Sequence, residues 1–486
     1  MRIHHLSRCR FLKRRLPVVI GLFALLAGCP SSPTQTAPAK QAVSSASQTP
    51  VPDERFTQSE PLAPSSSDTP SLTSAAMPAK PKPVELPDEE TLDEHGLSRI
   101  DAVPFIFISD LRVDQLQPII ETAPALIAMW DQTFGPMTKT PTWVVFIMEK
   151  VGPFKKLNLL PRDGAAVPHG LQLEDRVWIR VQETEYYTRH LFLHEATHAR
   201  MMAVSQFQGD GTLWFHEGIA EYIATHIIDS STSRIQLTAW PRDPRQLPGW
   251  NHFTKLQEAN KADRTSTLPW ILAYQADSYR RRDGQPYADS WALCQFLSLH
   301  PQYRDALSRC LKSSNWENVL QELTEPLLKD STIQLEWLAW LAAISPRDDS
   351  IQPVVSLPSM DAFSLAPFPV QTWVDLSSDQ LSGRPTEIKV DGRVNIRVKD
   401  RDVSSGPDGV TIEYRHGYPL GAVLGVITRR DLKGQVANPF SHPRIIGERA
   451  KFDMAADEFL YLSINQFPQS VTPGQPAYRV QIHTPE

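Results

Sequence analysis

Two histidines and a glutamate stand in a pattern that suits metal chemistry. His194 and His198 are four residues apart in the segment His-Glu-Ala-Thr-His, and the surrounding residues have helical periodicity. In a helix, residues at this spacing project from one face, so both imidazoles can bind a single zinc ion. Glu195 lies beside them, where its carboxylate can take a proton from water on the metal. The segment therefore predicts a zinc site with Glu195 as the general base.

A third ligand is predicted in a second helical segment. Eighteen residues separate His198 from Glu217, which lies in the segment Trp-Phe-His-Glu-Gly-Ile-Ala-Glu-Tyr at 214–222. A carboxylate from this helix would complete a three-ligand site with one position open for water. Glu221 follows one helical turn later and is predicted to hydrogen-bond a zinc-ligating histidine. His216 lies one residue off this face, so we expect it to contact substrate or solvent rather than metal.

The combined pattern resembles the gluzincin metallopeptidases, the clan of thermolysin and the zinc aminopeptidases. HExxH, eighteen further residues and a glutamate within W-x-x-E-G-x-A-E-Y carry the resemblance, which covers roughly residues 100–300. The metzincin pattern needs a further histidine where this chain has Val204. The resemblance implies zinc as the cofactor, a protein or peptide as the substrate, and His194, His198 and Glu217 as the zinc ligands.

The resemblance also implies a residue that stabilises the oxyanion of the reaction. Gluzincins usually use a Tyr or His for this purpose. Tyr287, seventy residues after Glu217, is the candidate, and Tyr274 and Tyr279 are alternatives. The presence of a tyrosine at position 287 could equally reflect packing at the start of a helix, without a catalytic role.

The segment at 176–182 alternates in polarity, which is typical of a half-buried strand. Arg176, Trp178 and Arg180 would share its open face. The resemblance implies that this strand is the sheet edge that pairs with the substrate backbone. The G-x-M-E-N segment with which aminopeptidases capture the free amine of a substrate is missing, so cleavage of internal peptide bonds is favoured.

The surrounding elements predict an α+β, zincin-like domain at 96–348, in which a small mixed sheet is joined to the HExxH helix and a helical subdomain. Residues 230–270 show no regular pattern. Strands are predicted at 105–108, 142–148 and 176–182, and helices at 113–134, 186–204, 213–228 and over most of 287–344.

Short β runs separated by turn residues predict a separate all-β sandwich at 349–486. Its last two runs, near 459–464 and 478–482, resemble the final hairpin of the LecA-like galactose-binding bacterial lectins, and the similarity covers about 371–484. In that family an Asp and two Asn of the loop bind the calcium that holds the sugar. The equivalent residues here are Gln466, Pro473 and Gly474, which supply no carboxylate for a hard cation. The loss of these ligands favours a structural or substrate-docking module. In the docking role, its ligand would be a glycan or a protein.

The N-terminus predicts export and lipid attachment. A basic stretch precedes the short apolar run at 16–27, and Leu-Ala-Gly at 26–28 precedes Cys29, which resembles a bacterial lipobox. We therefore expect a signal peptide at 1–28, a lipid anchor on Cys29, and location in the cell envelope, in the periplasm, at the outer membrane or at the cell surface. From residue 30 to 87, 37 of 58 residues are Pro, Ser, Thr or Ala, which predicts a disordered tether within a linker at 29–95.

Charge and cysteine content narrow the functional classes. The leader holds six of the 49 basic residues and none of the 55 acidic ones, so the remaining chain is acidic and unsuited to nucleic acid. Cys294 and Cys310 could form a disulfide in an exported protein or remain two buried thiols.

The main hypothesis is a lipid-anchored zinc metallopeptidase. The alternative is a non-catalytic surface binding protein, in which the sandwich recognises glycans or proteins and the zincin domain is a scaffold.

Overall fold

The computed structural model describes most of the chain from residue 86 to residue 484. The predicted signal peptide, Cys29 and the linker up to residue 85 lie outside the described residues. Among the described residues, no helix is long and apolar enough to cross a bilayer. The described ranges are 86–161, 167–204, 212–229, 234–240, 251–280, 284–313, 315–344, 351–356, 362–368, 370–376, 384–399, 401–468 and 475–484.

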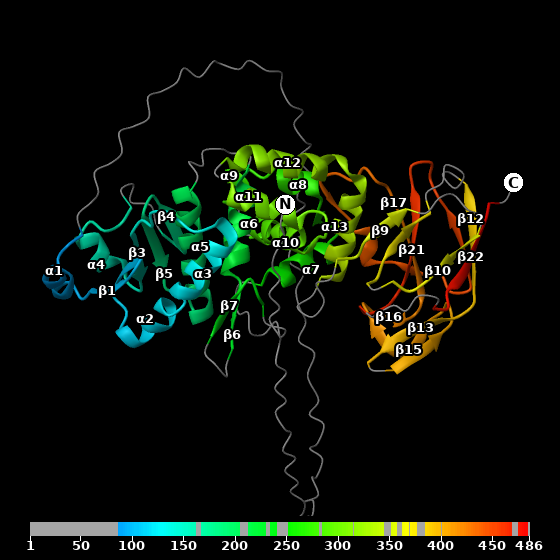
Figure 1. Cartoon of the computed structure of the whole chain (residues 1–486), viewed down its shortest axis with the longest axis horizontal. Coiled ribbons are helices and arrows are strands. Elements are labelled where there is room, and N and C mark those ends of the chain that lie inside the picture. Colours follow the sequence, from blue (N-terminus) through cyan, green and yellow to red (C-terminus); the bar gives the residue numbers. More distant parts are fainter. Residues whose placement is uncertain are drawn as a thin grey trace, which may run out of the picture. The chain divides into compact units, whose positions relative to one another are not determined.

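A five-stranded mixed sheet forms the N-terminal part of the described chain (Figure 1). Its order is β1-β2-β3-β5-β4, in which β2, β3 and β5 are parallel and the outer strands are antiparallel to their neighbours. The strands are β1 (Ser98–Ala102), β2 (Phe105–Ser109), β3 (Trp143–Met148), β4 (Gly170–Leu173) and β5 (Arg176–Arg180).

Helices cover both faces of this sheet, which explains why every residue of β3 is buried. One face packs on α2 (Val113–Ile120), α3 (Ala123–Phe134) and α5 (Glu185–Val204). The other face packs on α1 (Glu89–Glu94) and α4 (Val151–Lys156). Because α1 buries Leu92 in this second layer, ordered structure begins before the predicted linker boundary at residue 95.

The sheet corrects the prediction that the strand at 176–182 is the substrate-binding edge. β5 pairs with β3 on one side and with β4 on the other, so β4 is the edge strand. Trp178 is buried rather than open, since its ring stacks on Phe146 and its indole N–H donates to Leu159 O at 2.7 Å. Arg176 and Arg180, on the same face, are half-buried at the two ends of β5.

The single helix predicted over 113–134 is two helices, α2 and α3. The break falls at Glu121 and Thr122, immediately before Pro124 at the start of α3. Proline has no N–H to donate to the preceding turn but fits the first turn of a new helix. The chain therefore ends one helix and begins another at this point.

A helical part follows the sheet, as predicted, and α6 (Leu213–Ala224) packs closely against α10 (Gln285–Leu299). Gly218 makes this approach feasible, because a Cβ there would lie 2.5 Å from Ser290 O and 2.7 Å from Cys294 Sγ. The segment 230–270 is more regular than expected. The remaining elements are β6 (His226–Ile228), β7 (Ile235–Leu237), α7 (His252–Lys261), β8 (Thr265–Ser266), α8 (Leu268–Leu272), α9 (Ala276–Tyr279), α11 (Arg304–Lys312), α12 (Trp316–Lys329) and α13 (Ser331–Ala343).

The C-terminal region is β-rich, in agreement with the sequence. Its two larger sheets have the orders β10-β22-β12-β20 and β19-β17-β21-β11-β9, and β13-β14 and β15-β16 pair separately. Its strands are β9 (Val354–Ser356), β10 (Ala362–Leu365), β11 (Trp373–Asp375), β12 (Pro385–Asp391), β13 (Val394–Val398), β14 (Arg401–Ser405), β15 (Val410–Arg415), β16 (Tyr418–Leu420), β17 (Val423–Thr428), β18 (Gln435–Val436), β19 (Arg444–Ile445), β20 (Arg449–Asp453), β21 (Phe459–Ile464) and β22 (Tyr478–His483).

The C-terminal region is joined to the helical part by backbone and side-chain contacts. β18 pairs with β8, and Asn438 Nδ2 donates to Leu338 O at 2.9 Å. Trp373 and Phe440 belong to the same apolar cluster as the helices.

Cys294 and Cys310, which the sequence left open as a disulfide or two thiols, are both buried and free. Burial raises the pKa of each thiol, to about 12 at Cys310, so both stay protonated at neutral pH.

Candidate metal site and cleft

The structure places the HExxH residues on the middle of α5. His194 and His198 lie one helical turn apart, and their Nε2 atoms are 3.1 Å from each other. Apolar neighbours of these residues, including Phe192 and Ala196, are fully buried against the sheet. The helix is therefore fixed by its packing, and the two imidazoles leave it on the side that faces α6.

Glu217 on α6 completes a compact cluster of three ligand atoms. Its Oε2 lies 3.3 Å from His194 Nε2 and 3.4 Å from His198 Nε2. Zinc bound tetrahedrally at about 2.0–2.1 Å separates its ligand atoms by about 3.3 Å. The three separations of 3.1, 3.3 and 3.4 Å match that requirement without rearrangement, so these residues fit the metal that the sequence predicts.

The electrostatics of Glu217 suit a ligand role. Burial alone would raise the pKa of its carboxyl, but the imidazoles of His198 and His194 hold that pKa well below its usual range. His216 is outside the ligand cluster. Burial lowers the pKa of His216 to about 3, so its imidazole is neutral, and it stacks beside His198 at 6.5 Å.

Glu195 faces a cleft of about 730 Å³ that opens beside the ligand cluster. Burial raises the pKa of its carboxyl from the usual value, which makes it a stronger base than an exposed glutamate. The described residues that line the cleft are Pro168, His169, Gly170, Tyr187, Leu191, His194, Glu195, Glu221, Tyr279, Arg280, Gly284 and Tyr287.

The edge strand β4 passes directly over Glu195. A Cβ on Gly170 would lie 2.7 Å from Glu195 Cγ and would overlap the carboxylate, so a side chain here would have to displace Glu195. Arg180 N–H donates to His169 O at 2.7 Å, and Gly170 is in register with Ile179. Hydrogen-bonded pairs alternate along an antiparallel ladder, so the N–H and C=O groups of Gly170 and Gln172 point away from β5 to the open edge.

The three tyrosines considered for the oxyanion differ in their surroundings. The Tyr274 hydroxyl donates to Asp289 at 2.5 Å, and the Tyr279 hydroxyl is hydrogen-bonded to Ser290 at 2.6 Å. The Tyr287 ring lies 6.4 Å from that of His194 and lines the cleft. Burial raises the pKa of Tyr287 well above its usual value, so its hydroxyl carries a proton that it can donate.

Glu221 contacts a ligand histidine, and two further histidines contact Glu221. Its Oε1 lies 3.2 Å from His194 Nδ1. Its Oε2 accepts hydrogen bonds from His190 and His252, each at 2.9 Å.

The sequence interpretation missed three residues of the site: His190, His252 and Gly170. His190 was detectable, since it lies one turn before His194 on the same helical face. His252 begins α7 in the segment that showed no regular pattern. Gly170 belongs to a four-residue strand too short to be recognised by alternation.

The residues aligned with the lectin calcium loop are only partly described. Gln466 is 2% exposed, and its amide donates inward to Phe368 O. Pro473 and Gly474 lie outside the described residues.

Comparison with known proteins finds similarity only among solved structures. No protein-family model and no curated protein matches the chain. One similar structure is Legionella pneumophila aminopeptidase A in complex with aspartic acid, with 11% identity, a TM-score of 0.31 and coverage of 75% of this chain and 34% of that one. Another is an aminopeptidase N family protein from Idiomarina loihiensis, with 12% identity, a TM-score of 0.29 and coverage of 80% and 68%. This chain thus spans about a third of the length of the Legionella protein. Likeness at these TM-scores is too low to assign a function, which has to be inferred from the site itself.

Proposed function

We propose that the chain is a zinc-dependent metallopeptidase of the gluzincin type that hydrolyses internal peptide bonds. The observation that carries the proposal is the ligand triangle of His194, His198 and Glu217, with sides of 3.1–3.4 Å, beside the cleft-facing carboxylate of Glu195. Metal-assisted hydrolysis needs both a site that fits the ion and a base next to that site.

In the proposed reaction, Glu195 is the general base. Zinc at this site would lower the pKa of water and polarise the scissile carbonyl. Glu195 then takes the proton of the attacking water and gives it to the leaving amine. Glu195 is placed for this exchange, since it lines the cleft beside the ligand triangle.

Tyr287 and β4 would orient the substrate. The Tyr287 hydroxyl is the proposed donor for the oxyanion of the tetrahedral intermediate, because Tyr287 lines the cleft and its ring lies 6.4 Å from that of His194. The outward N–H and C=O groups of Gly170 and Gln172 would pair with an extended peptide. This arrangement assigns to β4 the role that the sequence interpretation gave to β5.

The described lining of the cleft favours internal bonds over N-terminal ones. Its only carboxylates are those of Glu195 and Glu221. Glu195 is the proposed base, and Glu221 is buried against three imidazoles. Neither is left to pair with the free amine that an aminopeptidase has to bind. We therefore propose an endopeptidase.

We further propose that the enzyme is exported and held in the cell envelope through Cys29, with the β-rich region binding a protein or glycan. The apolar run before Cys29 and the proline-rich tether after it support this placement. The inward-facing amide of Gln466 supports a module that binds no calcium at the lectin-like loop.

Substitution of Glu195 by Gln tests the catalytic proposal. The amide is nearly isosteric and cannot accept the proton, so the rate should fall by about a hundredfold or more with zinc content unchanged. Cleavage of a mixed peptide library and zinc content are measured for both proteins. As a control, His198→Ala should lose zinc and activity together.

Two outcomes would count against the proposal. Cleavage by Glu195→Gln at the wild-type rate would show that Glu195 is not the base. A wild-type protein that holds zinc but cleaves no member of a broad panel of peptides and unfolded proteins would favour the alternative, a surface binding protein with a zincin scaffold.

A further inference from the structure

A buried group of four side chains lies behind the ligand triangle. It consists of Glu221, His190, His194 and His252, all between 2% and 5% exposed. Oε2 of Glu221 accepts from Nε2 of His190 and from Nε2 of His252, each at 2.9 Å, and Oε1 lies 3.2 Å from Nδ1 of His194. One carboxylate thus contacts three imidazoles through both of its oxygens.

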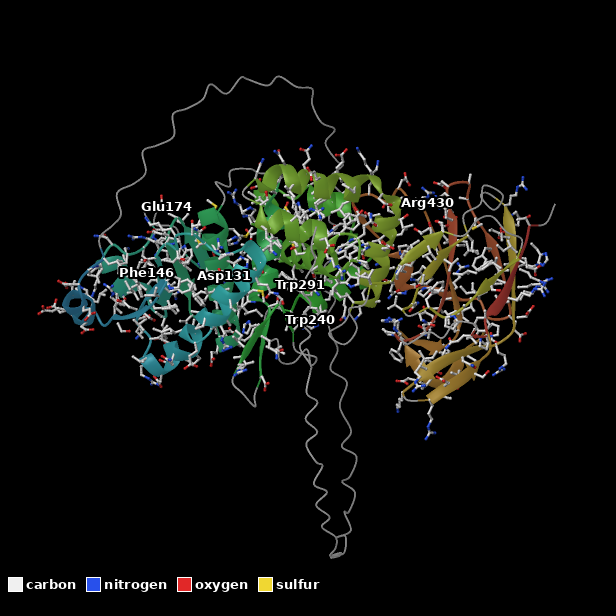
Figure 2. The ribbon with its side chains drawn as sticks, in the orientation of Figure 1. Asp131, Phe146, Glu174, Trp240, Trp291 and Arg430 are labelled. Atoms are coloured by element: carbon white, nitrogen blue, oxygen red, sulfur yellow. The ribbon has the colours of Figure 1, made fainter. Side chains whose placement is uncertain are left out.

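Three helices contribute to this group, so its geometry is held by the fold. His190 lies one turn before His194 on α5, and Glu221 lies one turn after Glu217 on α6. His252 is the first residue of α7, and its ring stacks on Trp291 of α10 at 5.1 Å. Trp291 in turn contacts Trp240 at 5.8 Å, and both tryptophans are labelled in Figure 2.

The two donors on Oε2 decide how Glu221 faces His194. A glutamate side chain has several rotatable bonds and two equivalent oxygens, so one contact alone leaves it free to turn. Hydrogen bonds from His190 and His252 hold Oε2, which leaves Oε1 for Nδ1 of His194. With its proton on Nδ1, His194 presents the lone pair of Nε2 to the ligand triangle.

Charge supports this arrangement. Oε2 of Glu221 accepts two hydrogen bonds and Oε1 lies 3.2 Å from a third imidazole, which are contacts that suit an ionised carboxylate. Burial lowers the pKa of His252, so that imidazole is neutral and donates through Nε2–H. A negative acceptor and N–H donors form charge-assisted hydrogen bonds, which are stronger than neutral ones.

We propose that His190 and His252 are positioning residues of the metal site, which act on His194 by holding Glu221. The proposal rests on the proposed function, because it assumes that His194 is a zinc ligand. Metal-ligating histidines commonly donate their second ring nitrogen to a carboxylate. The further step proposed here is that two histidines outside the HExxH pattern fix that carboxylate.

The same atoms raise a competing interpretation. His190, His194 and Glu221 lie close enough together to bind an ion of their own. His194 would then bind one cation through each ring nitrogen and would have to lose both ring protons. The hydrogen bonds of 2.9 Å already satisfy Oε2 without an ion, so the structure favours the hydrogen-bonded group. Metal stoichiometry separates the two interpretations.

The test measures zinc stoichiometry and zinc affinity, the latter by competition with a chelator, together with thermal stability. His252→Leu removes the donor at similar volume and should weaken zinc binding by about tenfold or more. His252→Gln retains an N–H near the position of Nε2 and should bind zinc much as the wild type does. His190→Leu, on the other side of the same oxygen, gives an independent test if His252→Leu does not fold.

His300→Leu is the matched control. His300 is also 5% exposed and donates from Nε2 to a glutamate, Glu336, at 2.9 Å, but it is outside both candidate metal groups. Its loss should lower stability and leave zinc affinity unchanged. If His252 acts through Glu221, His252→Leu should add nothing in a Glu221→Ala background.

Each outcome has a distinct meaning. A wild-type protein that binds no zinc contradicts the proposed function. One zinc per chain with equal affinity in wild type, His252→Leu and His190→Leu overturns the positioning role while the metal site stands. Two zinc ions per chain, one of them lost in His190→Leu, also overturn it, because the group would then be a metal site. One zinc, weakened by both leucine variants and restored by His252→Gln, supports the proposal.

Discussion

Contact with the ligand cluster favours Tyr287 over Tyr274 and Tyr279 as the oxyanion donor. Asp289 accepts from Tyr274, and Ser290 is hydrogen-bonded to Tyr279, so those two hydroxyls belong to the internal structure of the helical part. Tyr287 lines the cleft close to His194. The sequence named Tyr287 as the candidate from its spacing, with Tyr274 and Tyr279 as alternatives, but it could not show the partners of the three hydroxyls, which come together only in the fold.

Removal of the Tyr287 hydroxyl should affect the chemical step. Tyr287→Phe removes the proposed oxyanion donor, so kcat should fall by about a hundredfold with little change in KM. Steady-state kinetics on one cleaved peptide measures both constants. Tyr279→Phe is the matched control, whose kcat should stay near the wild-type value. A larger loss in Tyr279→Phe than in Tyr287→Phe would assign the donor to Tyr279.

A side chain at Gly170 should affect activity rather than stability, because the atoms it meets belong to Glu195. A Cβ there overlaps the Glu195 carboxylate, so Gly170→Ala should displace the base and lower the rate with zinc content unchanged. The measurement is kcat/KM together with zinc content. Gly152→Ala serves as the control, since a Cβ at that position meets nothing within 4 Å. Equal activity of the two variants would refute the prediction.

At the scale of elements, the sequence located the three residues that come together in the ligand cluster, but it misplaced the edge of the sheet. HExxH and the distance to Glu217 depend on two helices whose periodicity is visible in the chain. The edge assignment failed because the Arg-Val-Trp-Ile-Arg pattern of β5 is typical of a half-exposed strand, although Trp178 is buried with its N–H satisfied by Leu159 O. β4, which covers that edge, is too short for its pattern to be distinguished from a turn.

The contact between α6 and α10 leads to a prediction on stability. Alanine in place of glycine usually stabilises a helix by up to about 1 kcal/mol. At Gly218 the added Cβ would meet the backbone of Ser290 at 2.5 Å, so Gly218→Ala should instead destabilise the protein by about 1–3 kcal/mol. Urea unfolding of both proteins gives the difference in the free energy of unfolding. A stabilised variant would show that α6 and α10 are not in close contact.

At the scale of the whole described chain, the helical part and the β-rich region share apolar surface. Trp373 and Phe440 lie in the same cluster as the residues of α13, and Asn438 hydrogen-bonds Leu338 O. The sequence predicted two separate domains because its pattern changes from helix to strand near residue 348. Contacts between elements that are distant in sequence do not change the local spacing of apolar residues, so this pattern could not predict the shared surface.

A chain that ends at residue 348 should therefore be less stable than the full protein. Truncation would expose apolar surface on α13 that Phe440 and Trp373 cover, and exposed surface of this kind promotes aggregation. The yield of soluble protein and the cooperativity of thermal unfolding are the measurements, with a chain of residues 86–486 as the control. A truncated protein with wild-type stability would show that the boundary at 348 separates independent domains.

The pairing of β8 with β18 affects the order in which the two regions reach their final structure. Asn438 contacts Asn260 across 178 residues, and β18 pairs with the strand that precedes α8. Contacts so distant in sequence form late, because a long loop has to close before they contribute any stability. These contacts cannot form until residue 438 has been synthesised. The helical part therefore reaches its final contacts with the β-rich region only after residue 438 has left the ribosome, however early its own helices form.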